Sequence, residues 1–478
     1  MRRSSGVLLH PTSLPGAWGG GDIGPGARAF AAWLGRARQR WWQMLPLGPV
    51  DDTGSPYNSP SAFAGDPGLV SLDDLVAEGL LDAADPEMIA VGRDAPSGDV
   101  DFGFLSSRRI PLVRKAAARL VGQDPAALDA FAQAHPWADG WARFAASKRA
   151  DSRGWWDWDG APRPEDVRVE IAVQVLFARQ WARLRAAAAE AGVGLIGDLP
   201  IFVSADSADV AQNRDLFLLD AKGLPQVVAG VPPDAFSPTG QKWGMPLYDW
   251  PANAATDYAW WRARLTSLLS RVDVARIDHF RGFEAAWHVP ADAEDAREGS
   301  WVEGSGAPLF SALQDACGGD LPVIAEDLGI ITPAVERLRD RFGLPGMRIL
   351  QFAFGGEPNH AYLPHSYPER SVVYTGTHDN QTTAGWWQDI GEDERRRVAA
   401  YVGGMTDEPA WDLVRLAWSS RAELAVAPMQ DLLNLDDEAR LNTPGSSQGN
   451  WAWRLESAPD DVLAGRLAEV TLRSGRAG

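Results

Sequence analysis

The chain has 478 residues, of which 45% are hydrophobic and 23% are charged, so it is expected to bury a packed core and is not a disordered chain. Its 45 basic and 64 acidic side chains give a formal net charge of −19, which argues against a nucleic-acid partner or an anionic membrane surface, because both attract basic patches. The length suits two or three domains, or one large α/β barrel with insertions.

Cys317 is the single cysteine, so neither an intramolecular disulfide nor a cysteine-rich zinc site is possible. This suits a reducing cytoplasm. The apolar run at residues 6–9 is too short for a signal peptide, and no run of roughly 18 apolar residues predicts a transmembrane helix. We therefore expect a cytoplasmic protein that does not enter a membrane.

Short, nearly continuous apolar runs recur along the chain, as in strands that are buried on both faces. They cover residues 6–9, 41–46, 194–198, 274–278, 322–326, 347–352, 372–375 and 424–428. Apolar residues at helical spacing lie between them, at 173–184 and 258–272. Thr332 and Pro333 are typical of a helix start, and Gly343 ends that pattern. Eight strands that alternate with helices predict a closed (β/α)8 barrel of the TIM type.

Two intervals are too long for ordinary loops. Residues 51–168, approximately, follow the second predicted strand, and residues 204–257, approximately, follow the third. The first contains a Gly/Pro/Ser-rich stretch and then Ala-rich helical sequence, and the second is rich in Pro, Gly and Asp. We predict one catalytic barrel over residues 1–478, with these intervals as helical or irregular insertions on its rim.

Four predicted strands end in or near a carboxylate, at Asp198, Asp278, Glu326 and Asp379. The C-terminal strand ends of a parallel barrel converge on one face, so these groups are expected to share a site. A single aspartate there is often only a helix cap, but four clustered carboxylates repel one another and indicate a metal site or carboxylate catalysis. Metal binding is the weaker interpretation, because there is no HxH or HExxH pattern and His378 is adjacent to its carboxylate in sequence. We predict no metal and no cofactor.

The carboxylate interpretation is retaining glycoside chemistry. One carboxylate attacks the anomeric carbon. A second, protonated carboxyl group, about 5–5.5 Å from the first, donates its proton to the leaving oxygen. Arg276 precedes Asp278 by two residues, hence lies on the same side of the strand, and would keep Asp278 ionised. Alternatively, Arg276 only balances charge inside the barrel. Neighbouring carboxylates are expected to raise the pKa of Glu326 toward the range of a general acid.

These strand ends also carry family motifs. Residues 276–282 (RIDHFRG), 324–329 (IAEDLG) and 377–380 (THDN) resemble the nucleophile, acid/base and transition-state-stabilising strands of the amylomaltases, which are 4-α-glucanotransferases of glycoside hydrolase family 77 in the α-amylase superfamily. The resemblance extends over nearly the whole chain. It includes HPTSLP at 10–15, SPYNSPSAFAG at 55–65, GDLPI at 197–201, PPDAFS at 232–237 and NTPG at 442–445.

The resemblance implies a disproportionating transferase that acts on maltooligosaccharides and other α-1,4-glucans. Asp278 would form a covalent glucosyl–enzyme intermediate. Glu326 would protonate the leaving 4-oxygen and then deprotonate the 4-hydroxyl of the acceptor. Asp379 would bind hydroxyls of the distorted sugar, with His378 and Arg276 as supports.

The resemblance also implies binding residues around this trio. Tyr57 would stack on the same sugar ring, and Asp198 and Asp234 would bind hydroxyls at the rim. Trp243, in a segment at 240–243 that resembles a mobile loop of the family, would stack on sugar or pack under that loop. Met245 stands where the family usually has Asn, so the balance of transfer against hydrolysis is left open. Asp66 likewise replaces an Asn of the family motif.

Two other functions remain open: an amylase-like α-glucan hydrolase, and a non-catalytic glucan-binding protein. Both the hydrolase and the transferase use the same trio. The expected oligomeric state is a monomer or a small homo-oligomer.

Of the 22 tryptophans, those in predicted strands and helices are expected in the core, and three in the C-terminal part of the chain have no assigned place. The expected core residues are Trp41, Trp42, Trp181 and Trp261, and the unassigned ones are Trp387, Trp451 and Trp453.

Overall fold

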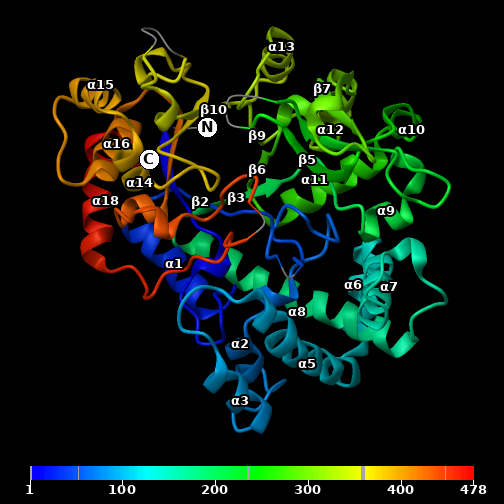
Figure 1. Cartoon of the computed structure of the whole chain (residues 1–478). Helices are drawn as coiled ribbons and strands as arrows, with labels where there is room; N and C mark the ends of the chain where they lie inside the picture. Colours follow the sequence, from blue (N-terminus) through cyan, green and yellow to red (C-terminus); the bar gives the residue numbers. More distant parts are fainter. Residues whose placement is uncertain (1–2, 52, 234–236, 357–360, 447, 478) are drawn as a thin grey trace.

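The computed structural model describes residues 3–51, 53–233, 237–356, 361–446 and 448–477. Its centre is a closed barrel of parallel strands, which confirms the predicted (β/α)8 fold (Figure 1). The barrel strands are β1 (Ser4–Leu8), β2 (Trp41–Gln43), β3 (Gly194–Leu199), β6 (Val274–Ile277), β9 (Val323–Ala325), β10 (Gly346–Ile349), β11 (Ser371–Tyr374) and β12 (Leu424–Pro428). Each pairs with the next in this order, and β12 pairs with β1 to close the barrel.

Helices follow most of these strands and cover the outside of the barrel (Figure 1). They are α1 (Pro25–Arg36), α8 (Pro164–Glu190), α11 (Ala259–Arg271), α12 (Ala307–Ala316), α13 (Pro333–Arg341), α14 (Thr383–Asp389), α15 (Glu392–Val402), α16 (Pro409–Ser419), α17 (Met429–Leu432) and α18 (Asp461–Arg473). The predicted helices are present as α8, α11 and α13. Thr332 caps α13, because its hydroxyl accepts a hydrogen bond from the backbone N–H of Val335.

The interval between β2 and α8 folds into helices, the last three of which pack along α8 (Figure 1). They are α2 (Leu72–Ala77), α3 (Pro86–Asp94), α4 (Phe102–Phe104), α5 (Ile110–Gln123), α6 (Pro125–Ala134) and α7 (Trp137–Ala150). The interval between β3 and α11 holds α9 (Ala208–Gln212), β4 (Val227–Val231), β5 (Gln241–Pro246) and α10 (Trp250–Ala255).

A second sheet was not expected from the sequence. Strands β4 and β5 join β7 (Ala285–Pro290) and β8 (Ser300–Glu303) in an antiparallel sheet of order β5-β4-β7-β8. The strand β8 is exposed along its whole length, so it lacks the apolar alternation by which a strand is recognised in a sequence. The insertions after β3 and β6 are therefore one structural unit beside the barrel.

Alternate residues of the barrel strands face inward and outward, which explains their continuous apolar sequences. The inward-facing cluster includes Leu8, Ile196, Val274, Ile324, Met347, Ile349, Val372, Tyr374, Leu424 and Val426. Their neighbours along the strands, such as Val7, Leu195 and Ala425, pack against the surrounding helices. The barrel is therefore a filled core that holds the strand ends rigidly.

Replacing Trp42 by Ala is expected to lower the free energy of unfolding by about 3–5 kcal/mol, because it removes a large fully buried ring. Trp42 is 0% exposed, packs edge-on against Phe30 of α1 with ring centroids 4.9 Å apart, and donates to the carbonyl of Leu9. Urea unfolding of wild type and variant measures the difference. A loss below about 1 kcal/mol, the size typical of surface changes, would contradict this packing role.

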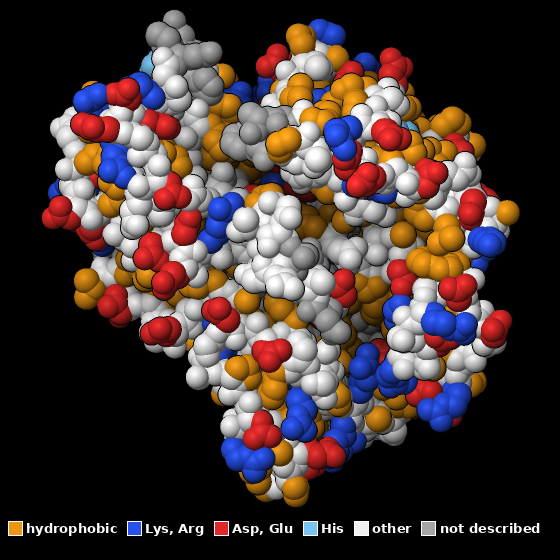
Figure 2. Space-filling model, viewed as in Figure 1, with side chains coloured by type: hydrophobic (Ala, Val, Ile, Leu, Met, Phe, Trp, Pro, Cys, Tyr) orange, Lys and Arg blue, Asp and Glu red, His pale blue; other side chains and the backbone are white. Residues whose placement is uncertain are grey.

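The outer surface mixes charges. Figure 2 shows Lys and Arg interspersed with Asp and Glu on the face that it displays, and a hollow in that face beside α6 and α7. Within the described ranges, no helix is long and apolar enough to cross a membrane.

Candidate active site

The four predicted carboxylates all lie at the C-terminal ends of barrel strands. Asp198 is in β3, Asp278 follows β6, Glu326 follows β9 and Asp379 follows β11 by a few residues. Backbone pairing continues past the strands, because the N–H of Asp278 donates to Leu199 and the N–H of Glu326 donates to Ile277, both at 3.0 Å. Parallel register thus sets Asp278 level with Glu326, and Asp198 level with Arg276, at one end of the barrel.

Arg276 joins two of them. Its Nη1 donates to Oδ1 and Oδ2 of Asp198 at 2.9 and 2.7 Å, and its Nη2 lies 2.9 Å from Oδ1 of Asp278. Burial opposes the charge of Arg276, but Asp198 and Asp278 outweigh it and raise the pKa of the guanidinium well above its usual range. The Asp278 side chain stays 27% exposed. The expected contact is therefore present, and the Asp278 carboxyl group remains partly open to a ligand.

Glu326 has the opposite environment. Burial and the nearby charge of Asp278 raise the pKa of Glu326 to about 8, although Arg276 and two backbone N–H groups oppose the shift. Its Oε1 accepts from the N–H of Leu328 at 2.8 Å, and its Oε2 accepts from the N–H of His279 at 2.7 Å. The side chain is thus held in place and is protonated at neutral pH, as a general acid requires.

The second of these bonds depends on an unusual backbone. His279 has φ of 50°, in the left-handed region that few residues other than glycine adopt. This turn directs the His279 N–H at Glu326 immediately after Asp278. The strained backbone at His279 therefore joins the segment that carries Asp278 to the side chain of Glu326.

Asp379 is held from the opposite side of the site. His378 Nε2 lies 3.3 Å from Asp379 Oδ2, and Asn442 Nδ2 donates to Oδ1 at 2.6 Å. Arg440 donates to the carbonyl of Asp379 at 2.8 Å. The Asp379 side chain remains 42% exposed, so it is oriented yet open to a ligand.

Asn442 and Arg440 had no predicted role. Asn442 does belong to the NTPG motif at 442–445, so a signal was present, but no local pattern tells which side chain it faces. Arg440 carried no signal at all. Both reach Asp379 only because the segment after β12 folds back across the end of the barrel.

Tyr57 and His378 stack almost in parallel, with ring centroids 5.2 Å apart and planes at 10°. The hydroxyl of Tyr57 donates to Oδ2 of Asp198 at 2.8 Å. We expected Asp198 either to bind sugar hydroxyls at the rim or only to brace the loop that follows it. The structure corrects the first of these placements: the Asp198 side chain is 0% exposed, because it is enclosed between Arg276 and Tyr57.

The remaining predicted residues lie in or near the second sheet. Trp243 in β5 packs edge-on against His279, with centroids 5.0 Å apart, and is only partly buried. Met245, also in β5, packs on the same hydrophobic cluster. Asp66 is buried and accepts from the N–H of Gly68, away from the trio. Asp234 lies outside the described residues.

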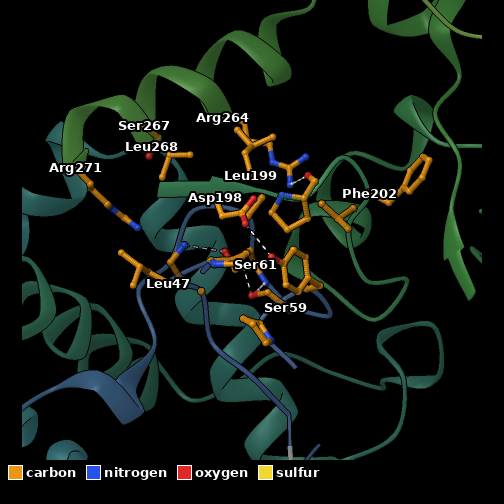
Figure 3. Close-up of a pocket in the computed structure, with 18 residues that line it drawn as sticks. Leu47, Ser59, Ser61, Asp198, Leu199, Phe202, Arg264, Ser267, Leu268 and Arg271 are labelled. Atoms are coloured by element: carbon orange, nitrogen blue, oxygen red, sulfur yellow. Dashed lines mark hydrogen bonds between the residues drawn. The ribbon is translucent and has the colours of Figure 1, made fainter. Parts of the chain in front are cut away.

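A pocket adjoins the site on the side of Asp198 (Figure 3). It lies between α11 and the segment at 46–64, and Asp198 and Tyr57 form part of its wall. Asp278 and Glu326 do not line it. Within the described parts of the chain, no group of three or more His, Cys, Asp or Glu side chains could hold a metal ion.

This arrangement defines a class of protein. A closed β/α barrel presents an arginine-held carboxylate, a buried protonated carboxyl group and a third, exposed carboxylate at its C-terminal face. That set is typical of barrel enzymes that act on glycosidic bonds through two carboxyl groups.

Comparison with known proteins names the family. A family model described as 4-alpha-glucanotransferase matches residues 9–459. The 4-alpha-glucanotransferase of Thermus thermophilus is 45% identical, over 98% of this chain and 99% of the relative. That of Synechocystis is 43% identical, over 99% of this chain and 98% of the relative. The chain therefore belongs to the 4-alpha-glucanotransferase family.

Solved structures agree. An amylomaltase from Streptococcus agalactiae, in complex with acarbose, matches with a TM-score of 0.95 and 34% identity over 100% of both chains. An amylomaltase from Corynebacterium glutamicum shares the fold, with a TM-score of 0.83 at 18% identity over 100% of this chain and 75% of that one. The resemblance read from the motifs and the predicted enzyme class, a 4-alpha-glucanotransferase, are confirmed.

Proposed function

We propose that this protein moves a segment of an α-1,4-glucan to the 4-hydroxyl of glucose or of another glucan by a retaining double displacement. One observation carries the proposal. Asp278, held by the Arg276 guanidinium, stands at the end of the strand next to that of a buried, protonated Glu326. The candidate acid thus keeps a proton at neutral pH while the candidate nucleophile is paired with a cation, as double displacement requires.

The first step breaks the donor. The Asp278 oxygen that Arg276 does not bind attacks the anomeric carbon, and Glu326 gives its proton to the departing 4-oxygen. The products are a glucosyl ester on Asp278, a shortened glucan and a Glu326 carboxylate. In the second step Glu326 takes the proton of the acceptor 4-hydroxyl, whose oxygen displaces Asp278. The carboxylate of Asp278 and the protonated Glu326 are restored.

The other residues bind and orient the sugar. Asp379 accepts hydroxyl hydrogen bonds at the cleavage point, supported by His378 and Asn442. Tyr57 offers a ring face beside His378 for stacking. Trp243 would stack on sugar, and Asp234 would bind hydroxyls at the rim.

Incubation with maltotriose tests the proposal. A ladder of longer maltooligosaccharides together with glucose is expected, because transfer conserves the number of glycosidic bonds. Products that only shorten would favour the hydrolase alternative, and binding without products would favour a glucan-binding protein. Proton NMR of newly formed linkages separates mechanisms, since inversion of the anomeric centre would contradict double displacement.

The activity is expected to have an alkaline limb near pH 8. Glu326 must be protonated to act first as an acid, so kcat/KM is flat below its pKa of about 8 and falls tenfold per pH unit above it. The measurement is the pH profile of kcat/KM on maltotriose. In the Glu326→Gln variant, assayed with an activated substrate, this limb is expected to be absent. A limb that survives the substitution would assign it to another group.

Asp198→Asn tests the corrected placement of Asp198. We propose that this carboxylate orients Arg276 and Tyr57 rather than touching sugar, because its side chain is enclosed. The expected result is a fall in kcat of about 10–100-fold with little change in KM, since the nucleophile and the stacking ring lose their alignment. A rise in KM alone would restore the role in substrate binding.

The family supports α-glucans as substrates, and maltooligosaccharides are the proposed donors and acceptors. A cytoplasmic location is supported by the single cysteine, Cys317, which is free. The monomeric or small homo-oligomeric state stays a prediction, which sedimentation of the purified protein would measure.

A further inference from the structure

Trp451 has a backbone conformation that its side chain disfavours. Its φ is 66°, in the left-handed region, where a bulky residue is a true outlier. In the described parts of the chain, other non-glycine residues with positive φ are Arg38, Asp257, Tyr258, His279 and Asn434. Of this set, His279 and Trp451 border the active site. The strain at His279 already has a purpose there, which prompts the same question for Trp451.

The backbone around Trp451 is held on several sides. Its N–H donates to the carbonyl of Leu441 at 2.6 Å, and the next carbonyl, that of Ala452, accepts from Val100 at 2.7 Å. Arg454 donates to the carbonyls of Gly16, at 3.1 Å, and Pro96, at 2.6 Å. These bonds tie the segment to the N-terminal loops and to the insertion after β2, so the strained turn is held in place.

The indole of Trp451 is buried, at 8% exposure, and it touches the two aromatic rings of the site. Its centroid lies 5.6 Å from that of Tyr57, with planes at 41°, and 5.9 Å from that of His378, with planes at 38°. Tyr57 and His378 stack on each other at 5.2 Å. The indole therefore forms the third side of a triangle of rings.

We propose that Trp451 is a positioning residue, whose left-handed turn drives the indole against Tyr57 and His378 and sets the face that they offer to the sugar. The proposal rests on the binding roles proposed above for Tyr57 and His378. A glycine or asparagine would adopt this turn without strain, but neither carries a ring that reaches both partners. The alternative is that the indole only caps the hydrophobic core inside the barrel, to which it also belongs.

Measurements of activity distinguish the positioning role of Trp451 from the role in capping the core. Trp451→Leu keeps an apolar side chain but no flat ring, and kcat is expected to fall about 10–100-fold, with KM changed less than about threefold, because the stacking pair loses its alignment. Trp451→Phe restores a ring and most of kcat. The matched control is Trp418→Leu in α16, at 0% exposure and bonded to Thr471 rather than to the site. Its melting temperature is expected to fall while kcat is unchanged.

Assays run well below the lowest melting temperature, so that all variants are folded. Equal kcat for Trp451→Leu and wild type would overturn the proposal. So would a Phe variant as poor as the Leu variant, since that would mean that only the volume of the indole matters.

A second pair of variants tests the strain. Trp451→Gly is expected to melt at a higher temperature than Trp451→Ala, the reverse of the usual order, because glycine adopts positive φ freely. Both lose kcat to the same extent, since both lack the ring. An Ala variant that melts higher than the Gly variant would contradict a strained turn.

Tyr57→Ala separates this inference from the function on which it rests. If Trp451 acts through Tyr57, the double variant Tyr57→Ala/Trp451→Leu has nearly the kcat of Tyr57→Ala alone. If the two losses multiply, Trp451 does not set the Tyr57 ring, so this inference fails as stated while the binding role of Tyr57 stands. If Tyr57→Ala has wild-type kcat and KM, the binding role proposed for Tyr57 fails first.

Discussion

Replacing Asp278 by Asn is expected to abolish transfer, with turnover of maltotriose reduced by about 10⁴-fold or more, on the scale seen when an enzyme loses its nucleophile. The amide is neutral and cannot form the glucosyl ester. The substitution is nearly isosteric, so the fold is expected to persist. The measurement is the rate of glucose release, with the product ladder followed by chromatography.

Two results make this test specific. Circular dichroism and melting temperature are expected to stay close to wild type, because Asp278 is partly exposed and its partner Arg276 keeps both oxygens of Asp198. Residual activity above about 1% of wild type in a preparation free of wild-type enzyme would refute a covalent mechanism through Asp278.

Glu326→Gln is expected to reduce turnover of maltotriose by about 10²–10⁴-fold, the usual contribution of a general acid–base group. The leaving 4-oxygen then departs without a proton. An activated donor such as α-maltosyl fluoride needs no protonation, so the ester on Asp278 still forms. It then accumulates, because Glu326 is no longer present to deprotonate the acceptor.

The variant is mixed with α-maltosyl fluoride and quenched with acid. Mass spectrometry of the intact protein then measures the covalent maltosyl adduct. An increase by the mass of one maltosyl group, mapped to the peptide that contains Asp278, is expected. Glu326→Asp is the matched control: it keeps the acid but shortens the arm, and so no adduct should accumulate to the same level. If Glu326→Gln loses the same fraction of its turnover with maltotriose and with α-maltosyl fluoride, the acid/base role of Glu326 is contradicted.

Glu326 also affects stability with a sign that follows from its raised pKa. The folded state keeps its proton up to about pH 8, whereas the ordinary value for such a carboxyl group is 4.5. Between these values the unfolded chain releases a proton that the folded chain retains, so the free energy of unfolding falls as the pH rises. Keeping Glu326 protonated in the active site therefore lowers the free energy of unfolding near neutral pH.

Much of this protein could be predicted from local sequence. Each barrel strand is a short apolar run, because both of its faces are buried, and that property is independent of distant residues. Asp278 and Glu326 follow such runs directly and Asp379 follows its run by a few residues, so strand order places them on one face. The pairing of Arg276 with Asp278 follows from a two-residue spacing along one strand.

Other features needed the tertiary structure. The segment after β12 supplies Asn442, Arg440 and Trp451 to a site whose catalytic strands lie far away in sequence. The sheet that joins β4 and β5 to β7 and β8 depends on pairing across the nucleophile strand, and the exposed β8 shows no pattern of its own.

Asp198 shows where the boundary falls. Its position at a strand end could be read from the sequence, and it does lie beside Asp278. Whether it faces sugar or protein depends on Tyr57, which reaches it from another loop and closes over it. Sequence alone therefore determined the barrel and the chemical identity of the carboxyl groups, because burial patterns and strand ends are local. Only the tertiary structure decided the exposure of each group and the distant partners of Asp198 and Asp379, because these depend on what other segments place around them.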